Sequence, residues 1–192
     1  MKEFDVKKLT SLGLLTAIVV VLQLLGSFIR FGPFSISLVL VPIVIGAALY
    51  GPAAGCWLGL VFGVTVLLSG DAAAFLAVSI PGTILTVLGK GAAAGAAAGW
   101  VYRLCAGKNE TQAVMLSACA APIANTGCFL IGCLLFFMGT LAGWAEGAGF
   151  GTNVFGFMII GLVGGNFIVE LIANVVLAPV ILRLIKMVRR SA

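Results

Sequence analysis

The hydrophobic and polar positions divide the chain into six long apolar runs, separated by short breaks rich in glycine, proline or charge. A membrane-spanning helix needs roughly 20 mainly apolar residues, and the runs are of that order. The pattern predicts an all-α integral membrane protein, a six-helix bundle in which residues 1–192 form a single membrane domain. The predicted spans cover residues 9–29, 33–50, 52–69, 83–104, 111–138 and 154–184.

Two connections between predicted spans are long enough to hold structure of their own. Residues 70–82 are too short and too interrupted by glycine and proline to cross a bilayer, so we expect a loop with a short interfacial helix. Residues 140–153 are rich in glycine, and there we expect a loop.

Glycine recurs every four residues along the third and fourth predicted spans. Residues four apart share one helical face, and small residues on such a face let two helices in a membrane approach closely. We therefore expect each span to pack against another helix through its glycines. They are Gly51, Gly55, Gly59 and Gly63 near the third span, and Gly91, Gly95 and Gly99 in the fourth.

The composition also indicates a membrane protein. Hydrophobic residues make up 62% of the chain and charged residues only 9%, and the mean hydropathy is +1.25. A water-soluble domain cannot bury so much apolar surface, so the lipid bilayer is the expected surrounding of most of the chain.

Basic residues mark one side of the membrane. All but two of the 11 Lys and Arg residues lie at the chain ends or in the short connection after the fourth span. Cytoplasmic segments carry such an excess, so we predict that both termini are cytoplasmic. Arg30, Asp71 and Glu146 then lie on the outer side. This distribution accounts for the net charge of +5 without a nucleic-acid partner.

Enzyme chemistry has little support in this sequence. Histidine is absent and there is no phosphate-binding loop, which argues against histidine-based catalysis and ATP hydrolysis by this chain. The five cysteines form no C-x-x-C pair, and we expect them to be reduced, apolar packing residues. We predict no catalytic residue, metal or cofactor.

Two charged residues inside predicted spans are the main candidates for function. Lys90 is the only cation in the bundle, and Glu170 lies between Asn166 and Asn174 on one polar stripe of the sixth span. A charge in a bilayer is costly unless it faces a partner, a cavity or a ligand. Lys90 could form an ion pair with Glu170, contact an anionic group of a solute, or be neutral or reach the membrane surface.

Other polar and aromatic residues are weaker candidates. Asn125 and Thr126 follow Pro122, which frees a backbone carbonyl, so they could line a cavity or form hydrogen bonds between helices. Trp144 in the glycine-rich outer loop could belong to an interfacial aromatic belt or cover a pocket.

The chain resembles the substrate-binding S components of energy-coupling factor (ECF) vitamin transporters. The resemblance covers nearly the whole chain and rests on six spans, basic cytoplasmic ends and the element GAALYGPAAG at residues 46–55. The small residues Gly13 and Ala17 in the first span match the position of the family's Ala-x-x-x-Ala motif, with glycine at the first place.

The resemblance implies a bundle in a bacterial-type plasma membrane that binds a vitamin from outside. It would deliver the solute by toppling in a complex with a transmembrane coupling protein and two ATPase subunits. Gly13 and Ala17 would dock on the coupling protein. The implied ligand site lies between the outer halves of spans four to six, under the outer loops. Its candidate residues are Lys90, Asn125, Thr126, Asn166, Glu170 and Trp144, with Arg30 and Asp71 as possible lid residues.

The sequence is compatible with three classes of membrane protein. The leading hypothesis is an S component for a small water-soluble vitamin or precursor. Lys90 slightly favours an anionic solute such as pantothenate, and riboflavin or a B6-type vitamin stays open. The alternative is a self-sufficient dimeric channel or exporter, in which the glycine faces form the dimer. An intramembrane enzyme would have only Glu170 or Asp71 as an acid.

Overall fold

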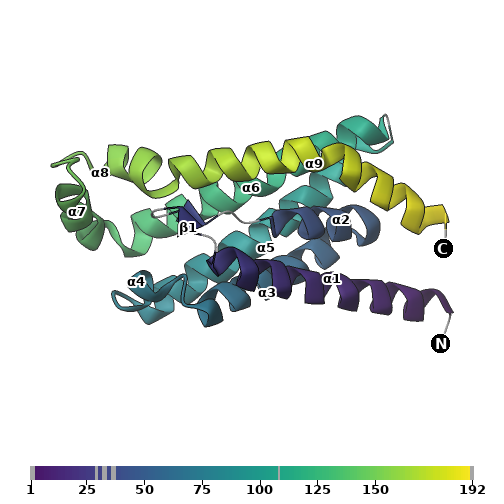
Figure 1. Ribbon diagram of the computed structural model, residues 1–192, viewed down its shortest axis with the longest axis horizontal. Coiled ribbons are helices and arrows are strands. Elements are labelled where there is room, and N and C mark those ends of the chain that lie inside the picture. The colour runs from purple at the N-terminus through teal and green to yellow at the C-terminus, as the bar shows by residue number, and fades with distance from the viewer. Residues whose placement is uncertain (1–2, 29, 32–33, 36–37, 108, 191–192) are drawn as a thin grey trace.

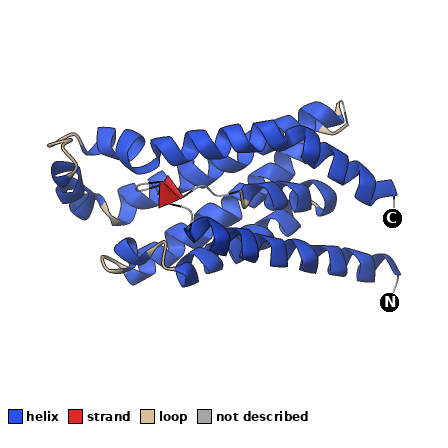
Figure 2. Cartoon of the chain, viewed as in Figure 1, coloured by secondary structure: helices blue, strands red, loops and turns tan. Residues whose placement is uncertain are grey.

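The computed structural model describes residues 3–28, 30–31, 34–35, 38–107 and 109–190, and nearly all of this part is helical (Figure 2). The helices run roughly along one long axis, and α1 begins at the same end of the bundle at which α9 ends (Figure 1). The helices are α1 (Glu3–Phe28), α2 (Leu40–Tyr50), α3 (Pro52–Ser69), α4 (Ala73–Leu76), α5 (Ile80–Cys105), α6 (Glu110–Phe136), α7 (Met138–Gly147), α8 (Val154–Gly156), the π-helical η1 (Phe157–Gly164) and α9 (Gly165–Arg190).

Five helical segments of the described chain are long and apolar enough to cross a membrane. They correspond to the first, third, fourth, fifth and sixth predicted spans. The sixth is a continuous segment, Val154–Arg190, made of α8, η1 and α9. A π-helical stretch of this kind widens the helix and is often found beside functional sites.

The predicted second span is wrong in its first half. Among its described residues only the 11 residues of Leu40–Tyr50 form a helix, which is roughly 16 Å long and covers about half of the hydrocarbon thickness. Before it, β1 (Arg30–Phe31) pairs antiparallel with β2 (Phe34–Ser35). The alternation of apolar Phe34 and polar Ser35 suits extended backbone better than an apolar helix.

Of the two long connections predicted from the sequence, one contains the expected short helix and the other is helical where a loop was expected. Residues 70–82 contain the short helix α4, as predicted. The predicted loop at 140–153 is wrong, because α7 covers most of it. Leu141 and Ala145 are four apart and buried on one face of α7, packed beside Phe137. This apolar face stabilises a helix despite the surrounding glycines.

The short helix α2 forms the centre of the core. Val39, at its N-cap, and Leu40, Ile43, Val44 and Ala47 are all completely buried. The helix packs against α1, α3, α5, α6 and α9. Because it is apolar on all sides, α2 is stable only where other helices surround it.

The two glycine faces pack against each other, which places the backbones of α3 and α5 in contact. A methyl group added at Gly59 would overlap the carbonyl oxygen of Gly91, and the same holds for Gly55 against Gly95. The expectation of close helix packing through these faces is confirmed, with α3 and α5 as mutual partners. Since both faces are occupied within one chain, they are not available for the dimer of the channel hypothesis.

Candidate binding site

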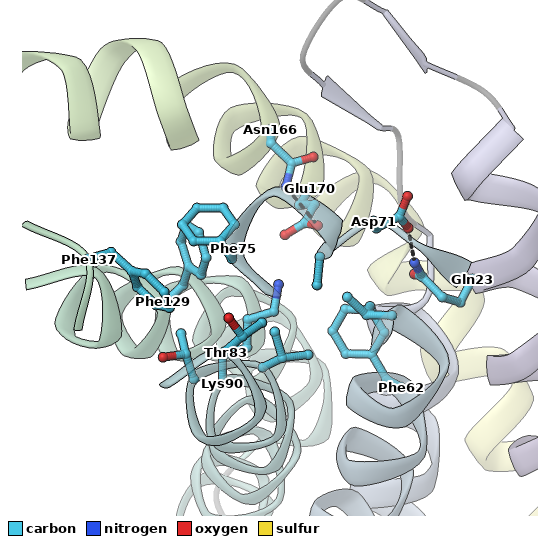
Figure 3. A pocket seen from close by; sticks show the side chains of 14 residues that line it. Gln23, Phe62, Asp71, Phe75, Thr83, Lys90, Phe129, Phe137, Asn166 and Glu170 are labelled. Atoms are coloured by element: carbon cyan, nitrogen blue, oxygen red, sulfur yellow. Dashed lines mark hydrogen bonds between the residues drawn. The ribbon is translucent and has the colours of Figure 1, made fainter. Parts of the chain in front are cut away.

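A cavity of about 160 Å³ lies among α1, α3, α4, α5, α6 and α9 (Figure 3). One part of its wall is aromatic and another is polar. The aromatic residues are Phe62, Phe75, Phe129 and Phe137. The polar residues are Gln23, Asp71, Thr83, Thr86, Lys90, Asn166 and Glu170.

Helix α5 provides one wall through a single face. Thr83, Thr86, Val87 and Lys90 all line the cavity, and their spacing of three, four and seven residues places them on one side of a helix. The adjacent face carries the glycines that contact α3. The close approach of α3 therefore determines which way the Lys90 side chain points.

Lys90 contacts aromatic rings instead of a carboxylate. Its ammonium nitrogen lies 5.2 Å from the ring centre of Phe129 and 5.5 Å from that of Phe62, within the range of cation–π attraction. Among the described residues Lys90 forms no ion pair. The hypothesis of a direct Lys90–Glu170 ion pair is therefore wrong. A cation–π contact is weaker than an ion pair, so the ammonium keeps its capacity to bind an anion.

Glu170 lies across the cavity from Lys90, and the two charged groups point into the same space (Figure 3). The side chain is 3% exposed. The Asn166 amide donates a hydrogen bond to Oε1 at 3.1 Å, whereas Oε2 is buried without a donor from the described chain. Asn174 donates to the Glu170 carbonyl oxygen at 2.8 Å, so the predicted polar stripe forms one continuous face.

Several other buried oxygens near this stripe have no donor among the described residues. They are the Oδ1 atoms of Asn125, Asn166 and Asn174 and the hydroxyl oxygen of Thr86. Buried polar atoms in folded proteins nearly always have a partner, so the unpaired atoms of the cavity-lining residues Thr86, Asn166 and Glu170 require an explanation. A bound molecule that donates hydrogen bonds would provide those partners.

Asp71 organises the rim of the cavity. Its Oδ2 atom accepts hydrogen bonds from Gln23 at 2.8 Å, Ser27 at 2.5 Å and Ser69 at 3.1 Å. Gln23 and Ser27 belong to α1, so this carboxylate joins α1 to the loop between α3 and α4 (Figure 3). Asp71 thus lines the cavity and also holds two elements together.

Phe75 covers one side of the cavity from α4. Its ring makes edge-to-face contacts with Phe129 at 5.5 Å, Phe137 at 5.0 Å and Trp144 at 5.3 Å between ring centres. Trp144 does not line the cavity, but supports Phe75 from α7. The aromatic cluster therefore joins α4, α6 and α7 around this wall.

The structure separates the residues predicted for the site. The cavity among α5, α6 and α9 is bordered by four of them: Lys90, Asp71, Asn166 and Glu170. Asn125 is buried near the Glu170 carboxylate. Their role in binding stays a prediction.

Thr126 does not line this cavity. It lines an apolar groove between α6 and the η1–α9 segment, because consecutive residues of a helix point in directions about 100° apart. Arg30 lies in β1, and its side chain is outside the described residues. Gly13 and Ala17 lie on an exposed face of α1, and a methyl group added at Gly13 would meet no atom within 4 Å.

Sequence reasoning missed the aromatic residues and Thr83, Thr86 and Gln23 as cavity residues. The threonines could have been found, because they lie seven and four residues before Lys90 on its own face of α5. The aromatic residues come from three other helices, and spacing along the chain contains no information about that neighbourhood.

No curated protein sequence matches the chain. A family model does match it, over residues 7–182, and that family is described as the ECF transporter, substrate-specific component. Because the match covers nearly the whole chain and the structure is a bundle of apolar helices around a polar cavity, this protein belongs to the family of ECF transporter substrate-specific components.

Proposed function

We propose that this protein captures a small water-soluble vitamin or vitamin precursor from outside the cell and passes it to a transmembrane coupling protein and two ATPase subunits. The observation that carries the proposal is the cavity of about 160 Å³ with the Lys90 ammonium free of any ion pair among the described residues. A half-buried ammonium that lines a cavity favours a solute with a carboxylate or phosphate, as in pantothenate, over an uncharged one.

The charge distribution supports a cytoplasmic position for both termini. Glu110 binds Arg189 at 2.8 Å and Lys186 at 3.9 Å, at the end of the bundle where the chain termini lie (Figure 1). Arg103 and Arg183 belong to the same basic set. By the positive-inside rule this end faces the cytoplasm of a bacterial-type cell. In this proposal α2 belongs to the second of six passes, and α4 and α7 lie on the outer side.

The exposed small residues of α1 support docking of a partner helix. Gly13 and Ala17 are four residues apart, and both are exposed in the described part of the chain. Such a face lets another helix approach closely in lipid. We assign it to the coupling protein.

Solute binding is tested on the purified full-length chain. Native mass spectrometry is expected to show a bound small solute, and titration of that solute should give roughly tenfold to hundredfold weaker binding in Lys90→Ala, the worth of a charge-assisted hydrogen bond. Undiminished affinity of Lys90→Ala for an anionic solute would contradict the role of Lys90.

Partner delivery is tested separately by placing tryptophan at Gly13 or Ala17. Uptake in cells should be lost while solute binding by the purified variant stays normal, because only the docking face is blocked. Tryptophan at the exposed position Leu14 is the matched control. Solute flux in liposomes that contain this chain alone would contradict the need for ATPase partners.

A further inference from the structure

Two oppositely charged groups face the same cavity, and neither satisfies the other. The Lys90 ammonium has three donor hydrogens. Within the described part of the chain it lies over the rings of Phe62 and Phe129 and forms no ion pair. Among the described residues, the buried Oε2 atom of the Glu170 carboxylate accepts no hydrogen bond, although the Asn125 amide lies near this carboxylate. A buried carboxylate and a half-buried ammonium with no ion pair among the described residues are both costly, so their position beside one space indicates a molecule that contacts both.

The requirements of the two sides differ in kind. On the α5 side, Lys90 requires a hydrogen-bond acceptor, best an anionic one. On the α9 side, the unpaired atoms are the carboxylate oxygen of Glu170 and the amide oxygen of Asn166, which accept hydrogen bonds. A solute with only an anionic group would satisfy Lys90 and place a negative charge beside Glu170.

The remaining wall limits the shape of the solute. Phe62, Phe75, Phe129 and Phe137 line the same cavity as the two charged groups. Aromatic walls favour a flat ring, which stacks or packs edge to face. A cavity of about 160 Å³ is similar in size to one that holds a single six-membered ring.

We infer that the solute is a single-ring, amphoteric molecule, with a hydrogen-bond-donating group directed to Glu170 and Asn166 and an acidic group directed to Lys90. The inference rests on the proposed function and narrows it. It favours a solute with one ring and both groups over a solute with several fused rings or with an acid as its only charged group.

The test uses three probes built on one ring: 3-(aminomethyl)benzoate, which carries both groups, benzoate with the acid alone, and benzylamine with the amine alone. Their affinities for the full-length protein are measured by isothermal titration calorimetry. The wild type should bind 3-(aminomethyl)benzoate at least about tenfold more tightly than either single-group probe.

Two variants assign each group of the probe to its residue. In Glu170→Gln, the ratio of the affinity for 3-(aminomethyl)benzoate to the affinity for benzoate should fall toward one. In Lys90→Met, the ratio of the affinity for 3-(aminomethyl)benzoate to the affinity for benzylamine should fall toward one. Each comparison is a double-mutant cycle between a residue and a ligand group, so it separates direct contact from general loss of affinity. If a variant does not fold, the three probes on the wild type decide the question.

The outcomes distinguish this inference from the proposed function. Benzoate that binds as tightly as 3-(aminomethyl)benzoate, with binding still lost in Lys90→Met, overturns the amphoteric solute and leaves the proposed function in place. A co-purified solute that lacks either group does the same, even if no probe binds. Failure to bind any probe, with no solute co-purified, overturns both.

Discussion

Helix α5 presents two neighbouring faces with opposite properties. On the face toward α3, Gly91 and Gly95 contact backbone directly and leave no space for a methyl group. On the face toward the cavity, Lys90 and Thr86 border open space, and the Thr86 hydroxyl oxygen has no partner among the described residues. The first face contributes packing, and the second has polar groups whose partners are not in the described chain.

The comparison shows why one helix contains both faces. Unpaired buried polar groups lower the stability of a fold, and a closely packed glycine face can offset that loss by dispersion contacts along the whole α3–α5 interface. The rigid contact also sets the rotation of α5, which orients Lys90. A functional site of this kind requires a stable support next to it.

The largest expected effect comes from filling the glycine face. Gly59→Ala and Gly91→Ala should each lower the free energy of unfolding by about 3 kcal/mol or more, because the added methyl group meets a backbone carbonyl that cannot rotate away. Thermal unfolding of the purified protein measures the change. Gly89→Ala is the matched control on α5, since no atom lies within 4 Å of its added methyl group. Equal stability of Gly89→Ala and Gly91→Ala variants would contradict the packing described here.

A substitution on the cavity face of α5 should raise the free energy of unfolding instead of lowering it. Lys90→Met removes a half-buried ammonium that has no ion pair among the described residues and keeps most of its volume, so the solute-free protein should gain about 1–2 kcal/mol of stability. The same variant should lose solute binding. Unfolding without solute and titration with the co-purified solute measure the two effects. A loss of stability comparable to that of Gly91→Ala would show that Lys90 is a structural residue.

A smaller effect is expected at the aromatic cover. Phe75→Ala removes three edge-to-face contacts, each worth about 0.5–1.5 kcal/mol. We expect the solute to dissociate about tenfold faster or more, which stopped-flow displacement can follow. Phe155→Ala is the control, because Phe155 is 60% exposed on α8 and does not line the cavity. The same dissociation rate in both variants would argue against a covering role of Phe75.

The smallest effect separates two neighbours on α6. Thr126→Val should change solute affinity by less than about twofold, because Thr126 lines the apolar groove outside the cavity. Asn125→Ala should weaken solute binding by about threefold to tenfold, the worth of one hydrogen bond, since Asn125 is buried near Glu170. Titration of both variants is the measurement. Equal effects would mean that these two residues share one environment, contrary to the structure.

Much of the architecture follows from residue spacing alone. The apolar runs predict the five long helices, because the hydrocarbon thickness requires a minimum length of apolar helix. The interval of four residues between Asn166, Glu170 and Asn174 predicts their common face, which the structure confirms. The family was likewise recognised from short motifs together with length and topology. These features depend on one helix at a time.

Features that depend on several helices required the tertiary structure. The sequence indicated that the glycines of α3 and α5 contact some helix, but only the fold shows that they contact each other. It could not decide whether Lys90 pairs with Glu170, since that depends on the rotation of α5 relative to α9. The short α2 and the aromatic wall likewise result from packing among α1, α3, α5, α6 and α9. Helix periodicity determines which residues share a face, whereas the neighbour of each face is decided by the packing of all helices together.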